Sequence, residues 1–159
     1  VTSGINAKIY EDMFEKTEDD YSGIMVKAIT DRLAEAFAEY MHNRVRQDLW
    51  GYQTKKLSNE EMIKEKYQGI RPAPGYPACP EHTIKKDIFS LLQAKEIGME
   101  LTESMSMMPA SSVSGFYFAH PEAKYFSVDK IDEDQIDDMA KRRSISKDQL
   151  KKWLASSLR

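Results

Sequence analysis

The feature that most constrains this sequence is a proline-rich segment in the middle of the chain. Four of its six prolines, at positions 72, 74, 77 and 80, fall within nine residues. Each proline fixes its own φ at about −65° and lacks the N–H that helices and inner strands require. The segment 69–80 is therefore predicted to be a stiff, extended loop of preset shape.

A rigid loop suits ligand recognition, because it has little conformational entropy left to lose on binding. Arg71 could hold a carboxylate through two parallel hydrogen bonds. Gly75 would let a ligand approach the backbone closely. These residues favour a binding loop, and a surface loop without a function is the alternative at this point.

Length, charge and cysteine content narrow the class of protein. A chain of 159 residues, 41% of them hydrophobic, is typical of one domain large enough to bury a core. A net charge of −3 argues against a general electrostatic hold on nucleic acid. No run approaches the ~20 apolar residues of a membrane helix. The single cysteine excludes an internal disulfide and favours a reducing, cytoplasmic location.

Helical patterns occupy both ends of the chain. A short helix is expected at 7–17 and a long one at 20–49, whose apolar residues recur every three or four positions until Gly51 ends it. Another is expected at 83–97, closed by Gly98. Three further helix starts carry paired capping residues, which are Ser58 with Glu61, Asp132 with Gln135, and Ser146 with Gln149.

Three strand-like segments lie between these helices, at 101–107, 113–119 and 124–128. Pro109 and Pro121 separate them. Short strands that cluster late in the chain, with helices on both sides, favour an α+β fold over alternating βαβ units. We therefore expect a small antiparallel sheet flanked by helices, with one long central helix.

Several possible functional motifs are incomplete. The glycines are scattered, so no G-x-G-x-x-G or phosphate-binding loop is present. Cys79 and His82 have the spacing of half a zinc site, but the second pair is missing, and a buried thiol is the better interpretation of Cys79. Glu39 and His42 have the spacing used in di-iron bundles, which need two copies. No metal site and no catalytic side chain are predicted.

Three acidic residues, Asp31, Glu35 and Glu39, recur every four positions on the long helix. Like charges at this spacing repel by ~0.2–0.5 kcal/mol per pair. A solvent-exposed helix face is the simpler explanation of the stripe. The other explanation is a wall of carboxylates that faces a cationic ligand.

The proline-rich segment also resembles a known family. The sequence RPAPGYPACPEH at 71–82 is similar to the S-adenosylmethionine-binding signature of the C-terminal activation domain of cobalamin-dependent methionine synthase. The resemblance continues through DRLAEAFAEYMHNRVR at 31–46, LTESMSMMPASSVSGFYFAHPEAKYF at 101–126, and the tail through Trp153. It covers nearly the whole chain.

The resemblance implies a function within a methyltransferase that moves a methyl group from methyltetrahydrofolate through cobalamin to homocysteine. In this family the domain supports reductive methylation of inactive cob(II)alamin, with S-adenosylmethionine as methyl donor. It implies two cofactors, S-adenosylmethionine and a cobalamin held by a neighbouring domain. It also implies two partners, that cobalamin-binding domain and a flavodoxin-type electron donor, and neither nucleic acid nor membrane.

The resemblance also assigns site residues. Arg71 corresponds to the arginine that binds the methionyl carboxylate, and 73–78 to the backbone around the adenosyl group. The residues implied to bind S-adenosylmethionine are Arg71, Ala73, Gly75, Tyr76, Ala78, Tyr125, Phe126, Glu35 and Glu65. Arginine, carboxylates and aromatic faces suit a ligand with a carboxylate, an ammonium and a sulfonium.

Residues 1–159 are expected to be the C-terminal part of this domain, with an upstream part that includes an acidic site residue absent. Two other functions are compatible with the residues. One is a binding module that senses S-adenosylmethionine without a role in turnover. The other is a free-standing methyltransferase, which the missing glycine-rich loop disfavours.

Overall fold

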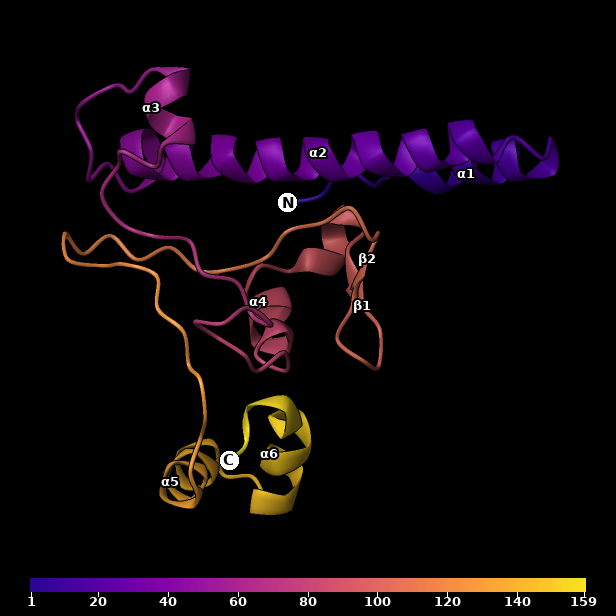
Figure 1. The fold of residues 1–159 in the computed structure, drawn as a ribbon. Helices are drawn as coiled ribbons and strands as arrows, with labels where there is room; N and C mark the ends of the chain where they lie inside the picture. The colour runs from indigo at the N-terminus through magenta and orange to yellow at the C-terminus, as the bar shows by residue number, and fades with distance from the viewer.

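The computed structural model describes all residues, 1–159, and places the longest helix along one edge of the molecule (Figure 1). Helix α1 (Ala7–Lys16) packs beside helix α2 (Asp20–Arg44). A π-helical turn, η1 (Val45–Leu49), prolongs α2, and Gly51 follows it with a φ of 72°. The predicted helices at 7–17 and 20–49, and the end at Gly51, are confirmed.

The remaining elements are short, and all of them except α3 lie on the same side of α2 (Figure 1). Helices α3 (Asn59–Ile63) and α4 (Lys85–Leu91) are followed by the 3₁₀ turn η2 (Ala94–Ile97). Strands β1 (Glu100–Leu101) and β2 (Met107–Met108) form the only sheet. Helices α5 (Glu133–Arg143) and α6 (Lys147–Trp153), with the turn η3 (Ala155–Ser157), lie at the end farthest from α2. No helix is both long and apolar enough to cross a membrane.

The three capped helix starts are confirmed. Ser58 and Glu61 form a complete capping box, in which each side chain accepts from the other residue's backbone N–H. The Ser58 amide lowers the pKa of the Glu61 carboxyl to about 2, with help from Lys55. At α5 the Gln135 side chain accepts from the Asp132 N–H, and at α6 Ser146 Oγ accepts from the Gln149 N–H.

The prediction of one continuous helix at 83–97 is wrong, because the segment forms two separate elements. Helix α4 ends at Leu91, and Gln93 adopts a left-handed φ of 50° before η2 begins. Leu91 and Leu92 at the break are both largely exposed, so no buried apolar face continues through this point. Gly98, with a φ of 76°, closes η2 as predicted for the end of the segment.

The predicted strands are also shorter than expected. The segment 101–107 is a hairpin instead of one strand, with Glu100 opposite Met108 and Leu101 opposite Met107. The Thr102 side chain accepts from the Ser106 N–H at 3.0 Å, which closes the turn. The small antiparallel sheet is thus confirmed, but it has two strands of two residues each.

Segments 113–119 and 124–128 are extended but do not join that sheet. They lie against the proline-rich segment. The Phe116 N–H donates to the Pro72 carbonyl, and the Phe118 N–H donates to the Ile70 carbonyl. The Val128 N–H donates to the Pro77 carbonyl at 2.8 Å. Prolines accept but cannot donate, so these contacts cannot grow into a regular ladder.

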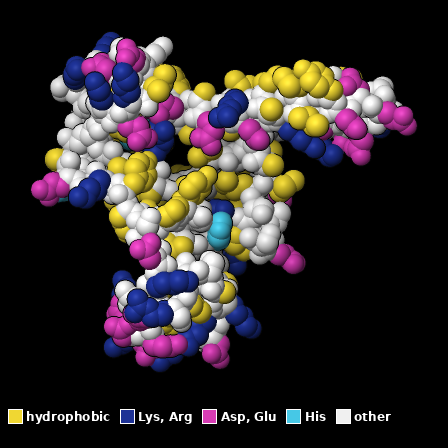
Figure 2. All heavy atoms as spheres, viewed as in Figure 1, with side chains coloured by type: hydrophobic (Ala, Val, Ile, Leu, Met, Phe, Trp, Pro, Cys, Tyr) yellow, Lys and Arg dark blue, Asp and Glu magenta, His cyan; other side chains and the backbone are white.

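The apolar residues that predict α2 are largely exposed, although the helix itself is confirmed. Ile24, Ile29, Leu33, Phe37 and Tyr40 are between 40% and 65% exposed. Figure 2 shows hydrophobic side chains gathered along the outer edge of this helix. The face of α2 that is buried carries smaller and polar residues at a spacing of four, which are Ala34, Ala38, His42 and, in η1, Arg46.

The C-terminal helices have a small core of their own. Ile136, Ala140, Leu150 and Leu154 are each at most 4% exposed and pack together. An ion pair between the half-buried Arg143 and the buried Glu81 links this pair of helices to the end of the proline-rich segment. Glu81 also accepts from the Thr83 N–H at 2.6 Å, so its buried carboxylate is satisfied from both sides.

Candidate functional site

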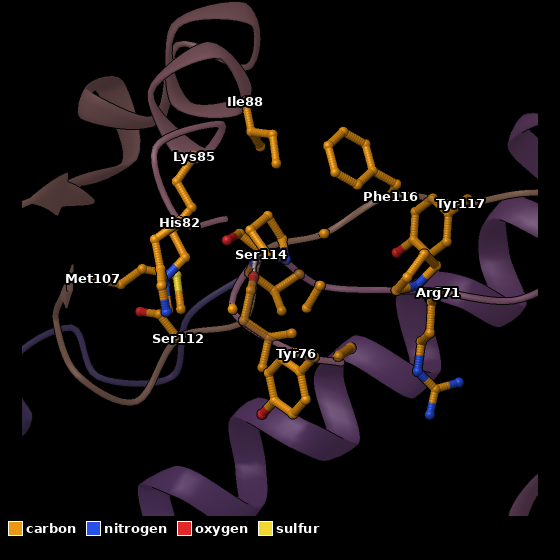
Figure 3. Close-up of a pocket in the computed structure, with 18 of the residues that line it drawn as sticks. Arg71, Tyr76, His82, Lys85, Ile88, Met107, Ser112, Ser114, Phe116 and Tyr117 are labelled. Carbon is orange, nitrogen blue, oxygen red and sulfur yellow. Dashed lines mark hydrogen bonds between the residues drawn. The ribbon is translucent and has the colours of Figure 1, made fainter. Parts of the chain in front are cut away.

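A large cavity of about 850 Å³ lies between α2, the proline-rich segment, α4 and the extended segment 112–127. Most of its lining is apolar, with polar groups at both ends. Figure 3 shows Arg71 and Tyr117 at one end, and His82, Lys85 and Met107 at the other. A cavity of this size and composition is typical of a site for a small organic ligand.

The proline-rich segment forms one wall of the cavity and is held in a fixed shape. Pro72 and Pro74 are buried, and Gly75 donates its N–H to the Cys79 carbonyl at 2.7 Å. Gly75 has a φ of +95°, and a Cβ there would lie 2.1 Å from the His82 ring. The imidazole of His82 therefore packs where a Cβ would lie, while Gly75 itself is exposed and lines the cavity.

Arg71 supplies the positive charge at its end of the cavity. Its Nη1 forms an ion pair with Glu39 Oε2 at 2.7 Å and donates to Tyr67 Oη at 2.6 Å. Its backbone N–H donates to Tyr125 Oη at 3.0 Å. Burial lowers the pKa of the Arg71 guanidinium, but the Glu39 carboxylate and nearby tyrosines outweigh it and the pKa is raised overall.

The structure brings eight of the nine predicted site residues to the lining of one cavity. These eight are Glu35, Arg71, Ala73, Gly75, Tyr76, Ala78, Tyr125 and Phe126. Glu65 is the exception: it is exposed just after α3, with a φ of 50°, and does not line the cavity. Its carboxylate accepts from Tyr67 Oη at 3.3 Å, so it reaches Arg71 only through that tyrosine.

The three residues of the acidic stripe on α2 have different surroundings: Asp31 and Glu35 are exposed and Glu39 is half-buried. Asp31 accepts from Ser111 Oγ at 2.6 Å and so fastens the segment after β2 to the helix. Glu35 lines the cavity, and Glu39 pairs with Arg71. A solvent-exposed face therefore fits Asp31 and Glu35, which are exposed, but not Glu39, which is half-buried against Arg71.

Other residues of the lining were not predicted from the sequence. Lys85 is only 7% exposed, and its Nζ donates to the Met105 carbonyl at 3.0 Å and lies 3.1 Å from His82 Nδ1. Burial lowers the pKa of this lysine. Ser114 lines the cavity with a buried hydroxyl that has no hydrogen-bond partner. The sequence offers no signal for these residues, since each reaches the cavity through long-range packing.

The structure contains no group of three or more histidine, cysteine, aspartate or glutamate side chains that could hold a metal ion. Cys79 is half-buried, and burial raises the pKa of its thiol. The thiol is therefore less buried than the buried-thiol interpretation predicts.

Comparison with known proteins assigns the chain to a family. A model of the activation domain of vitamin B12 dependent methionine synthase matches residues 1–144. The chain belongs to this family. The resemblance on which the sequence-based expectations rest is thereby confirmed.

A solved structure of an activation domain is also similar over almost the whole chain. The crystal structure of the MetH reactivation domain bound to AdoHcy shares 56% sequence identity with this chain and has a TM-score of 0.95. The match covers 99% of this chain and 49% of that chain, so residues 1–159 span about half the length of that relative. This similarity confirms the α+β fold predicted from the sequence, which is the fold of an activation domain.

Proposed function

We propose that the cavity binds S-adenosylmethionine, and that the chain acts in the reactivation module of a cobalamin-dependent methionine synthase. One observation carries the proposal. The proline-rich segment and Arg71 form the wall of a cavity of about 850 Å³ in a chain that is 56% identical to a reactivation domain solved with AdoHcy. AdoHcy is S-adenosylmethionine without the transferred methyl group.

The lining fits the separate parts of this ligand. Arg71 offers a charged, planar donor for the methionyl carboxylate. Glu35, across on α2, offers a carboxylate for the ammonium or the sulfonium. The aromatic faces of Tyr76, Tyr125 and Phe126 suit the adenine ring and the positive sulfur.

In this proposal the chain contributes binding and orientation rather than a nucleophile or a general acid. Cobalamin, held by a neighbouring domain, would supply the methyl acceptor, and a flavodoxin-type partner would supply one electron for reductive methylation. The rigid cavity wall would hold the S-methyl group toward that neighbour. Such positioning can lower a reaction barrier because it replaces a bimolecular encounter with an ordered one.

Replacing Arg71 with alanine is expected to weaken S-adenosylmethionine binding by tenfold or more. A hydrogen bond to a charged group contributes about 1.5–3 kcal/mol, and the Glu39 carboxylate left behind would repel the ligand's carboxylate. Calorimetric titration of the complete domain that carries residues 1–159 measures the effect. Arg142→Ala is the matched control, since Arg142 is exposed and pairs only with Asp138. Unchanged affinity in Arg71→Ala would remove Arg71 from the site.

We also propose that residues 1–159 are the C-terminal part of an activation domain and that an upstream part completes the site. Two observations support this. The solved relative is about twice as long as the match, and the apolar side chains on the outer face of α2 have no cover within this chain. A two-stranded sheet of four residues also gives the cavity little support.

The length of the protein is therefore expected to change its affinity. We expect residues 1–159 alone to bind S-adenosylmethionine at least tenfold more weakly than a version extended upstream to a whole domain, because part of the wall would be missing. Parallel calorimetric titrations measure the difference. Equal affinities would mean that the cavity described here is the whole site.

A further inference from the structure

His42 is a fully buried histidine beside the candidate site, and the proposed function gives it no role. It lies near the end of α2 with 0% of its surface exposed. Its Nδ1 is 3.3 Å from Arg71 Nη1, and its Nε2 is 3.3 Å from Tyr52 Oη. Both ring nitrogens thus have one polar neighbour each.

The neighbours decide where the imidazole carries its proton. A guanidinium has donors and no acceptor, so the Nδ1 that faces Arg71 must be the unprotonated nitrogen. The proton then lies on Nε2, which donates to Tyr52 Oη. His42 is therefore a neutral acceptor toward Arg71.

The ring is also held in its orientation. The Tyr117 ring stacks on it with centroids 4.9 Å apart and planes 14° apart, and the Tyr67 ring meets it edge-on at 5.0 Å. A second buried cation, Arg46, lies 3.9 Å above the centre of the Tyr67 ring. Charged and titratable groups from α2, η1 and three separate segments surround the imidazole, namely Glu39, Arg46, Tyr52, Tyr67, Arg71 and Tyr117.

All the side-chain hydrogen bonds of Arg71 converge on one nitrogen. Nη1 has His42 and Tyr67 as hydrogen-bond partners, one for each of its two N–H groups, and forms an ion pair with Glu39, whereas Nε and Nη2 make no hydrogen bond within the chain. Arg71 lines the cavity, and Nε and Nη2, which have no partner within the chain, are the two donors that can bind a carboxylate with two parallel bonds.

We propose that His42 is a positioning residue for Arg71: as a neutral acceptor it helps to fix Nη1, so that the opposite edge of the guanidinium is held ready for the ligand's carboxylate. This inference rests on the proposed function. It assigns to His42 an effect on one part of the ligand only, which a general packing role would not produce.

Two variants separate these roles. His42→Phe keeps a flat ring between the tyrosines but has no acceptor, and His42→Asn keeps an acceptor near the place of Nδ1. In the complete domain we expect His42→Phe to weaken S-adenosylmethionine binding about fivefold, the contribution of roughly one hydrogen bond. His42→Asn should restore most of the affinity. Neither variant should alter the affinity for 5′-methylthioadenosine, which lacks the carboxylate.

A double-mutant cycle with Arg71→Ala completes the test. If His42 acts through Arg71, adding His42→Phe to Arg71→Ala causes no further loss of affinity. Additive losses, or an equal loss for 5′-methylthioadenosine, would overturn the inference. If Arg71→Ala weakens binding and His42→Phe does not, the proposed function stands and this inference fails.

One measurement does not depend on the ligand. The ¹⁵N spectrum of the His42 imidazole at neutral pH should show an unprotonated Nδ1 and a protonated Nε2. The opposite tautomer, or a doubly protonated ring, would overturn the inference whether or not S-adenosylmethionine binds. Absence of S-adenosylmethionine binding by the unmodified domain would instead overturn the proposed function and, with it, the positioning role.

Discussion

Gly69→Ala is expected to lower the free energy of unfolding by about 3 kcal/mol, which would be measured as a large drop in the urea concentration at the unfolding midpoint. Gly69 has a φ of +91°, which is unfavourable for any residue with a Cβ. A Cβ there would lie 2.3 Å from the Phe118 carbonyl oxygen, a backbone atom that cannot rotate away. Relief of that overlap would break the paired hydrogen bonds between Ile70 and Phe118, both 3.0 Å long.

Gly23→Ala is the matched control for this variant. Gly23 lies within α2, and its nearest neighbour across space would be Phe14 Cβ at 4.0 Å, an ordinary contact. Alanine in a helix is better than glycine by about 0.5–1 kcal/mol, so this variant should be slightly more stable than the parent. Equal stability of the two variants would contradict the predicted overlap between a Cβ at position 69 and the Phe118 carbonyl oxygen.

Acid is expected to destabilise the protein at a pH where most of its carboxylates are still charged. Burial, with the nearby charges of Arg46 and Arg71, lowers the pKa of His42 to about 3 from an ordinary value of 6.5. Below pH 6.5 the unfolded chain takes up a proton at His42 and the folded chain does not, so the free energy of unfolding falls as pH falls. At about 1.4 kcal/mol per pH unit, the loss between pH 6.5 and pH 5 is about 2 kcal/mol.

The measurement is urea unfolding across this pH range, with NMR titration of the His42 ring alongside it. Between pH 6.5 and pH 5 the free energy of unfolding should fall less steeply in His42→Asn than in the parent, by roughly 1.4 kcal/mol per pH unit, because the variant has no imidazole to take up a proton on unfolding. His120→Gln is the control, since it removes an exposed imidazole from the same chain. A His42 resonance that titrates near pH 6 would contradict the prediction.

Sequence reasoning succeeded where a feature depends on near neighbours. The capping pair at Ser58 and Glu61 and the rigidity of the proline-rich segment are local properties of a few residues. The position of Arg71 at a cavity was predicted from the same segment and its family resemblance. These features needed no knowledge of distant parts of the chain.

The features that were missed depend on contacts between distant segments. Glu39 and His42 both contact Arg71, which comes from a distant part of the chain, so the sequence alone suggests half of a metal site or, for Glu39, part of an acidic stripe. The segment 83–97 was predicted as one helix closed by Gly98. The helix break at Gln93 could not be predicted, because no glycine or proline marks the left-handed turn there.

The way the cavity wall is joined has a consequence for folding. The hydrogen bonds between the region of the proline-rich segment and the extended segment 112–127 connect residues far apart in sequence. Gln68 and Ala119 are 51 positions apart, and Arg71 and Tyr125 are 54. Closing such long loops costs entropy before the contacts are gained, whereas α2 and the α5–α6 pair form from local contacts. The binding site should therefore assemble late in folding. A bound ligand would then act mainly by holding together two chain segments that are otherwise joined by only a few hydrogen bonds, and so by slowing their separation.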